Sequence, residues 1–354
     1  MGLFHKKNSK VLGIDISPHS LKLLELGRFR GRYRVEAYGN ERIPEGIVTE
    51  DAINDTEAVG ACLRRLLAKA HTSLKFGAVA VSNSSTIIKS VKMPAALTED
   101  ELESQIMVEA SDYIPYPIDE VALDFEVQGL DPQNAERVDV LVAACRKDRV
   151  ECHDELLEMA GLKVKVVDID VYAIERAYQH LIEPQIGASE RNSPVAVIDI
   201  GASTTTIHVM EKGKITYTRS QSFGGHQMIQ EMQHQYDMTA DEAELAVKFQ
   251  NFPANFEAEI LAPFRATVTR QITRILQFFY SSTDVHEVDS IVLTGGVSSI
   301  ADLALHVSRQ EGVECIVADP FAEMAIGKKV NSVALANDAP ALVLACGLAM
   351  RSFD

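Results

Sequence analysis

Two aspartates each close a short apolar strand and precede a turn of small residues. Asp15 lies in Val11–Ser17, and Asp199 lies in Val195–Thr205, about half a chain further on. A carboxylate at a strand end can hold Mg²⁺ or its waters, and the N–H groups of the following turn can cradle phosphate. The repeat therefore predicts two similar half-sites that grip a nucleotide phosphate chain.

A third segment, Ile291–Ile300, contains an apolar strand, the pair Gly295-Gly296 and the start of a helix. Paired glycines let a backbone approach a flat ring or a phosphate, because no Cβ stands in the way. Each segment also has a purely structural interpretation. Aspartate often ends a strand by bonding its own backbone, and paired glycines often make a tight turn.

The elements that must position these residues alternate between strands and helices, which indicates a mixed α/β fold. In the first half, apolar spacing predicts strands at 11–16, 21–26, 33–43 and 78–81, and a helix at 55–70. A polar turn at 187–193 separates the halves. The second half repeats the pattern with strands at 195–200, 204–210 and 214–220, helices at 225–236, 240–249 and 257–280, and alternation over 291–351.

The stretch 85–165 has the pattern of a separate module. A capping box at Thr98–Glu101 begins a helix that should run to about Ile114, where Tyr113–Pro117 must end it because proline cannot continue a helix. Around that helix the sequence predicts strands at 87–91, 122–127, 138–144 and 164–167, a polar loop at 129–137 and a helix at 147–160 stopped by Gly161.

The overall composition excludes several classes of protein. The net charge of −17 opposes nonspecific binding to nucleic acid and adsorption of the whole chain to anionic lipid. The five cysteines form no CxxC pair, which is typical of reduced cysteines in a cytosolic protein. We expect no signal peptide, no apolar run long enough to span a bilayer and no metal site built from histidine.

Together, the three segments resemble the actin-like ATPase superfamily, in which a nucleotide sits between two related domains. Residues 15–22 match its first phosphate loop, 199–205 its second and 294–298 its adenosine loop. The resemblance implies an actin-like fold, which is α/β and is built from duplicated ribonuclease H-like domains around a nucleotide cleft.

The place of the module at 85–165 narrows the resemblance. An insertion there is similar to that of FtsA, and the whole chain is most similar to the actin-like family of type IV pilus assembly. The features that carry this are Gly13–Ile16, Glu109-Ala110 with Tyr113–Ile118, Leu123–Phe125, Val197–Gly201 and Ala318–Phe321. FtsA also ends in a basic amphipathic membrane helix, which this sequence lacks.

The resemblance implies a division into four parts. The first actin-like domain comprises 1–84 and 166–190, completed by the C-terminal helix at 340–354. The inserted α/β subdomain is 85–165. The second actin-like domain comprises 191–226 and 288–339, and a helical nucleotide-capping subdomain is 227–287.

The resemblance also implies a site for ATP and Mg²⁺. Asp15 and Asp199 would flank the metal, largely through waters. The wider set of nucleotide-binding residues would be Gly13, Asp15, Ser17, Lys22, Asp199, Gly201, Ser203, Thr204, Thr205, Glu244, Lys248, Gly295, Gly296 and Val297. Glu244 and Lys248 would meet the ribose and adenine; a solvated ion pair one helical turn apart explains them equally well.

Hydrolysis is expected to be weak or absent. Ala202 stands where actin has an acidic residue that helps to organise metal and water, and alanine cannot do so. Asp168 and Asp170 are the candidates for positioning the attacking water, and Asp170 is the better match to the family pattern. Since loss of one preorganised group typically slows an enzyme about a hundredfold or more, tight binding with slow turnover is expected.

The function implied is a cytoplasmic scaffold, peripheral to the inner membrane, that docks the cytoplasmic N-terminal peptide of a bitopic pilus membrane protein. Candidate lining residues are Tyr113, Ile114, Tyr116 and Ile118; an ordinary helix-ending turn is the alternative. Neither nucleic acid nor direct membrane insertion is expected, and self-association and pilus motor ATPases remain open. A small-molecule kinase and an FtsA-like division protein are the alternative functions.

Overall fold

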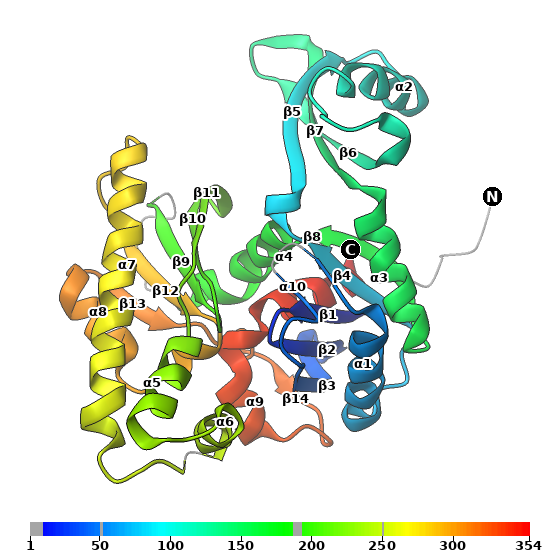
Figure 1. Ribbon diagram of the computed structural model, residues 1–354. Coiled ribbons are helices and arrows are strands. Elements are labelled where there is room, and N and C mark those ends of the chain that lie inside the picture. The colour runs from blue at the N-terminus through cyan, green and yellow to red at the C-terminus, as the bar shows by residue number, and fades with distance from the viewer. Residues whose placement is uncertain (1–9, 50–51, 187–192, 250) are drawn as a thin grey trace. The chain divides into compact units, whose positions relative to one another are not determined.

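The computed structural model describes residues 10–49, 52–186, 193–249 and 251–354, with backbone alone for Lys248 and Phe249 (Figure 1). The chain forms two compact units. Unit 1 contains Met1–Glu25, Gly39–Ala173 and Arg351–Asp354, and unit 2 contains Leu26–Tyr38 and Ile174–Met350. The turn expected to separate the two halves, 187–193, lies outside the described residues except for Ser193.

A six-stranded sheet carries the first aspartate, with strand order β14-β3-β2-β1-β4-β8. Strand β1 pairs antiparallel with β2 and parallel with β4, and β4 pairs parallel with β8. A hairpin followed by parallel strands needs a crossover, which α1 supplies between β3 and β4. The bounds are β1 Leu12–Ser17, β2 Ser20–Phe29, β3 Arg32–Arg42, α1 Thr56–Ala70, β4 Phe76–Val81, β8 Lys163–Ile169 and β14 Ala325–Ile326.

Helix α3 (Lys147–Met159) packs beside α1 in the core of unit 1. The Asp55 side chain accepts a hydrogen bond from the Ala58 N–H and so begins α1. Leu63 and Leu66 of α1 are buried together with Leu156 and Leu157 of α3. This apolar contact fixes the helices that flank strand β4.

A three-stranded antiparallel sheet with order β5-β7-β6 forms a smaller part of unit 1, drawn in cyan and green in Figure 1. Helix α2 covers one face of it, where Leu102 and Ile106 meet Val140 and Val142. Both the Thr98 capping box and the helix it begins are present. The bounds are β5 Thr86–Pro94, α2 Glu99–Ala110, β6 Val121–Asp131 and β7 Asn134–Arg146.

Two boundaries in this part differ from the sequence prediction. Helix α2 ends at Ala110 rather than near Ile114, and the expected polar loop at 129–137 is mostly the end of the β6–β7 hairpin. Solvated strand ends explain the second error, because exposed strands can be polar on both faces. Lys92 of β5 reaches the carboxylate of Asp131 at 2.7 Å and so supports the hairpin end.

Unit 2 contains a five-stranded sheet of order β11-β10-β9-β12-β13, which carries the second aspartate. Strands β9 and β10 form an antiparallel hairpin, and β9 pairs parallel with β12. This register sets Asp199 opposite Thr294. The bounds are β9 Val195–Ile200, β10 Thr205–Glu211, β11 Lys214–Gln221, β12 Ser290–Thr294 and β13 Glu314–Val317.

Helices cover this sheet with a large apolar core that includes Ile272, Ile275 and Phe279. The helix expected at 257–280 begins with a π-helical turn at Glu257–Leu261 before α7. The helices are α4 Asp170–Ala177, α5 His226–Tyr236, α6 Ala240–Phe249, α7 Ala262–Ser282 and α8 Leu303–Glu311. Helix α4 begins in unit 1 and ends in unit 2.

The C-terminal helical segment Ser332–Phe353 has the length and apolar composition of a membrane span, and its most apolar window of 18 residues has a mean hydropathy of 1.7. The sequence prediction that no apolar run is long enough to span a bilayer is therefore wrong by the criteria of length and composition. The structure breaks this segment into α9 (Ser332–Asp338), a 3-10 turn containing Pro340, and α10 (Val343–Ala349). Since 61% of its most apolar window is buried inside the protein, a core segment explains the composition equally well.

Candidate functional site

The first half-site lies on the β1–β2 hairpin, where Asp15 and Lys22 face each other across the two strands. Lys22 Nζ lies 2.8 Å from Asp15 Oδ2 and 3.3 Å from Ser17 Oγ. The Lys22 and Asp15 side chains are 12% and 7% exposed. The hairpin therefore brings together three of the predicted residues, and the lysine balances the charge of the buried carboxylate.

Gly13 and Ser17 flank that pair along β1. Gly13 is buried in the strand interior, opposite Leu24 on one side and Ala78 on the other. The Ser17 hydroxyl donates a hydrogen bond to the Ser20 carbonyl at 3.0 Å, which closes the turn. Gly13 can therefore meet a ligand only through its backbone.

Asp170, the predicted water-positioning residue, begins helix α4 at the end of β8. Its Oδ1 accepts hydrogen bonds from the N–H groups of Asn83, at 2.9 Å, and Val171, at 2.7 Å. Burial, with a smaller contribution from the nearby charge of Asp15, raises the pKa of Asp170 to about 6 against the opposing effect of these bonds. A carboxyl group with such a pKa can exchange a proton near neutral pH.

Asp168, the other candidate, is held differently. Its Oδ2 lies 3.2 Å from Arg351 Nε, and its Oδ1 accepts a hydrogen bond from the Ile169 N–H. The Asp168 carboxylate is thus already bound to the C-terminal part of unit 1, which favours Asp170 for a role toward a ligand.

The second half-site joins the ends of β9 and β12. Gly295 has φ +85°, and a Cβ there would lie 2.4 Å from Asp199 Oδ1 and 2.4 Å from the Ile200 carbonyl oxygen. Two features therefore require glycine at position 295: the positive φ of its backbone and the closeness of Asp199. At Gly296 an added Cβ would meet open space, and Val297 is buried directly behind it.

The turn after Asp199 is closed by a hydrogen bond of 2.9 Å from the Gly201 N–H to the Thr204 carbonyl. Ser203 is exposed and Thr204 is half-buried. Thr205 is buried, and its hydroxyl donates to the Phe223 carbonyl at 2.8 Å. The Thr205 hydroxyl thus holds the turn in place, whereas Ser203 is presented to solvent.

A second glycine pair, Gly224-Gly225, packs against this turn and was missed by sequence reasoning. The Gly225 N–H donates to the Gly201 carbonyl at 3.0 Å, and a Cβ at Gly224 would lie 2.5 Å from the Ala202 carbonyl oxygen. The signal was present, because a Gly-Gly pair directly before helix α5 repeats the pattern of Gly295-Gly296.

The remaining predicted residues, Glu244 and Lys248, lie one turn apart on α6. Glu244 is half-buried, and the side chain of Lys248 lies outside the described residues. Their part in a nucleotide site therefore stays a prediction.

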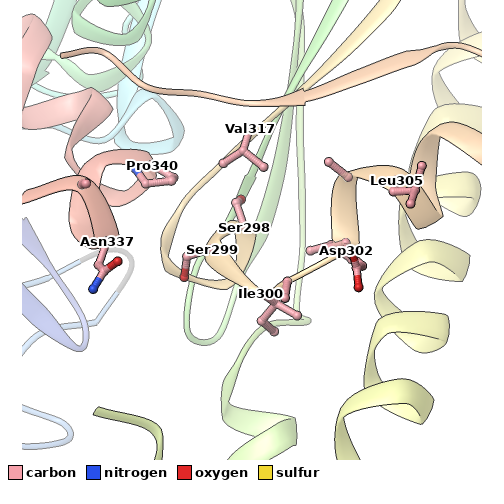
Figure 2. Close-up of a pocket in the computed structure, with 12 residues that line it drawn as sticks. Ser298, Ser299, Ile300, Asp302, Leu305, Val317, Asn337 and Pro340 are labelled. Carbon is pink, nitrogen blue, oxygen red and sulfur yellow. The ribbon is translucent and has the colours of Figure 1, made fainter. Parts of the chain in front are cut away.

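A cavity of about 340 Å³ lies beside the glycine turn of unit 2 (Figure 2). Asn337 and Pro340 form one side of it, Asp302 and Leu305 the other, and Ser298 lies between them. The Gly295 N–H donates to the Pro340 carbonyl at 2.9 Å, so this cavity adjoins the turn expected to meet the nucleoside. Its mixed apolar and polar lining suits a nucleoside.

The donors fit a hydrated Mg²⁺ better than a directly bound metal. Within residues 10–49, 52–186, 193–249 and 251–354, no three Asp, Glu, His or Cys side chains gather closely enough to hold a metal ion. Each half-site instead offers a single strand-end carboxylate, Asp15 or Asp199. Mg²⁺ usually keeps several waters and binds through one or two carboxylates together with substrate phosphates.

The residues predicted to line a peptide site do not share one environment. Ile114 is 5% exposed and packs with Ala110 and Val121, so its prediction as a lining residue is wrong. Tyr113 and Ile118 pack partly against the same cluster. Tyr116 is 41% exposed, with the guanidinium of Arg146 above its ring. The segment turns back onto its own sheet and leaves one aromatic side chain outside.

Comparisons with known proteins bear on the family and the fold of the chain. The profile of the family described as type IV pilus assembly protein PilM matches residues 13–353. Among solved structures, the chain is similar to one in a PilM-PilN type IV pilus biogenesis complex, with 26% identity, coverage of 98% of this chain and 99% of that chain, and a TM-score of 0.76.

A further solved structure supports the fold alone. The ethanolamine utilization protein EutJ from Carboxydothermus hydrogenoformans is 18% identical, covers 96% of this chain and 89% of its own, and has a TM-score of 0.56. The expected actin-like fold is confirmed, and the kinase and division-protein alternatives are not favoured.

Proposed function

The chain belongs to the PilM family of type IV pilus assembly proteins, and we propose that it is a nucleotide-dependent scaffold that docks the cytoplasmic peptide of a PilN-like membrane protein. The observation that carries the proposal is the match over 13–353 to this family, joined to the likeness with a chain from a PilM-PilN complex. On this proposal the protein works in the cytoplasm and meets the inner membrane through its partner.

ATP is the proposed nucleotide. The support is chemical and comes from each unit by itself: unit 1 offers the carboxylate of Asp15 with the cation of Lys22, and unit 2 offers the carboxylate of Asp199 beside the close backbone turn at Gly295. Lys22 and the N–H groups of the glycine turns would bind phosphates. When bound, Mg²⁺ would neutralise phosphate charge, with Asp15 and Asp199 holding its waters. The nucleoside would enter the cavity next to Pro340.

Hydrolysis is proposed to be slow because Ala202 supplies no polar group. Asp170 would remain as the group that orients water or accepts its proton, since a carboxyl group with a pKa of about 6 is mostly charged near neutral pH and holds a proton more readily than an ordinary aspartate. The bound nucleotide would then stabilise one conformation of the scaffold rather than be consumed in rapid turnover.

The proposed docking surface for the peptide is the small sheet of unit 1. Strands β5 and β6 are its edges, and an edge strand can accept an added strand. Exposed apolar side chains lie on or near β6, namely Tyr116, Val127 and Leu130. A peptide strand could pair with the edge strand β6 and place its own apolar side chains against these exposed ones.

Co-purification with detergent-solubilised inner membranes tests the proposal. We expect a bitopic pilus protein of the PilN type to be retained by the immobilised chain, and to be released by an excess of its own N-terminal peptide. Retention that persists when that peptide is deleted from the membrane protein would contradict the proposed docking.

A further inference from the structure

The tip of the β2–β3 hairpin concentrates positive charge in an otherwise acidic protein. Residues 27–35 read Gly-Arg-Phe-Arg-Gly-Arg-Tyr-Arg-Val, with four arginines and no acidic residue, whereas the whole chain carries −17. Arg30 and Gly31 have φ of 51° and 82° and make the tight turn. We call residues 28–34 the arginine tip.

Two aromatic rings lie among these guanidinium groups. Phe29 is 44% exposed, and the Arg30 and Arg34 guanidinium carbons lie 5.3 and 5.2 Å from its ring centre. The Arg28 guanidinium lies 5.6 Å from the ring centre of Tyr33. Since neighbouring residues of a strand point to opposite faces, the tip presents an aromatic ring and arginine on both faces of the hairpin.

The acidic groups that face the tip do not cancel its charge. Glu36 holds Arg34 at 2.6 Å, and a Cβ at Gly27 would lie 2.4 Å from the Glu36 carboxylate, so glycine makes room for this pair. Glu323 lies 3.9 Å from Arg32, but their side chains are 86% and 73% exposed, and such a pair is worth little. The tip segment itself carries four arginines and no acidic residue, so its own charge is positive.

We propose that the arginine tip docks on the anionic headgroup surface of a lipid bilayer. Headgroups are mobile and can close around both faces of a hairpin at once, whereas a folded acidic protein can cover only one. Each basic side chain at such a surface adds favourable binding energy, and an exposed aromatic ring suits the boundary between headgroups and acyl chains. This is a peripheral contact, made despite the repulsion from the rest of the chain.

Nucleic acid fits the same feature less well. Proteins that bind single strands use an extended basic groove lined with stacking aromatics along several nucleotides. The tip is a convex turn of seven residues, and the net charge of the chain repels a polyanion along any longer path.

The equivalent hairpin of the five-stranded sheet shows that the turn itself does not require this composition. Between β10 and β11, Lys212 and Gly213 have φ of 54° and 78°, nearly the same as Arg30 and Gly31. That turn reads Glu-Lys-Gly-Lys over 211–214, without arginine or an aromatic residue. It therefore provides a matched control on a hairpin of the same backbone shape.

The role of this contact in the cell rests on the proposed function, because a partner peptide would hold the protein at the membrane. A tethered protein meets lipid at a high effective concentration, so a weak contact is enough to orient it. The contact itself can be measured without the partner.

The test is flotation of the purified full chain with vesicles of phosphatidylcholine, with or without about a third phosphatidylglycerol, at about 0.1 M salt. We expect binding only to the anionic vesicles, at least about tenfold weaker for Arg28→Gln/Arg32→Gln and weaker for Phe29→Ala at unchanged charge. Lys212→Gln/Lys214→Gln should bind like the unaltered chain. Thermal melting of each variant checks its fold.

Equal binding to both vesicles, no binding, or an equal loss in the control variant would overturn the proposal. Tighter binding of an RNA oligomer or of a polyglutamate peptide, lost in the same arginine variant, would assign the tip to that other partner. The two proposals can fail separately: Arg28→Gln/Arg32→Gln should still bind the partner peptide, and vesicle binding should persist if peptide binding proves absent.

Discussion

The ammonium group of Lys22 lies 2.8 Å from the carboxylate of Asp15, and both side chains are nearly buried. Burying an isolated charge costs several kcal/mol, and the attraction between these two opposite charges offsets that cost. Both residues also belong to the predicted phosphate and metal site. On the proposed function, Lys22 would bind phosphate and Asp15 would hold the waters of Mg²⁺, so each charge would keep a partner of opposite sign when the nucleotide is bound.

Removing one partner of this pair should destabilise the ligand-free protein. Lys22→Met leaves Asp15 buried without its cation, at a cost of about 3 kcal/mol or more. The double variant Asp15→Asn/Lys22→Met should recover most of that loss, because no buried charge remains. Urea unfolding without nucleotide measures the stability change of the single and of the double variant. A double variant as unstable as the single one would show that the loss of the ion pair does not cause the destabilisation.

Each strand-end aspartate should matter for nucleotide binding. Asp15→Ala and Asp199→Ala each remove a carboxylate proposed to hold the waters of Mg²⁺ and should weaken the binding of Mg²⁺–ATP about tenfold or more. Isothermal titration calorimetry measures the affinity. Asp148→Asn, which loses surface ion pairs with Arg146 and Arg149, is the control. If both alanine variants kept full affinity, the nucleotide site would have to lie elsewhere.

Turnover of ATP should be slow. Ala202 cannot organise metal or water, so we expect a rate well below about 1 s⁻¹, the lower end of ordinary enzymes. A steady-state phosphate-release assay with saturating Mg²⁺–ATP measures it. A rate of about 1 s⁻¹ or more would refute the scaffold role of the nucleotide.

The raised pKa of Asp170 predicts a pH-dependent stability. Its pKa is about 6 in the folded chain and about 4 in an unfolded one, so the folded state binds the proton more tightly. The stabilising contribution is complete below about pH 4 and is lost as the pH rises through 6. The new side chain in Asp170→Asn does not ionise. As the pH rises over this range, the free energy of unfolding of the variant should therefore increase relative to that of the unaltered chain, by at most about 3 kcal/mol.

Urea unfolding at pH 4.5 and pH 7.5 measures that difference. Asp148 should have the opposite effect on the pH dependence of stability, because the hydrogen bond from Arg146 lowers its pKa. Asp148→Asn should therefore lose stability relative to the unaltered chain as the pH rises. A gain for Asp170→Asn that is the same at both pH values would mean that ionisation of Asp170 is not involved.

Much of this architecture could be predicted because it follows local rules. The strand carrying Asp15, the strand carrying Asp199 and helix α6 match their expected ranges closely, since apolar periodicity and turn residues determine them, whereas β2 runs three residues beyond its expected end at Leu26. The Thr98 capping box also forms as the sequence predicts.

What could not be predicted depends on tertiary contacts. Ile114 was expected at an open surface, but the segment folds back and buries it beside Val121. Gly224 is needed because the Ala202 carbonyl lies 2.5 Å from where its Cβ would be; the Gly-Gly pair signals a close approach, but the sequence does not reveal which residue approaches. Likewise, the pairing of Asp168 with Arg351 joins residues that are far apart in sequence.

Partner docking is the central claim, and binding of a PilN-like N-terminal peptide tests it most directly. Fluorescence anisotropy of the labelled peptide should give saturable binding that survives about 0.5 M salt, because apolar anchors are little screened. Tyr116→Ala should weaken it about tenfold or more while melting temperature and ATP binding persist; Tyr33→Ala, on the other unit, is the control. Saturable binding lost only in Tyr116→Ala is the predicted result, and no binding by the folded, ATP-loaded chain would contradict the account.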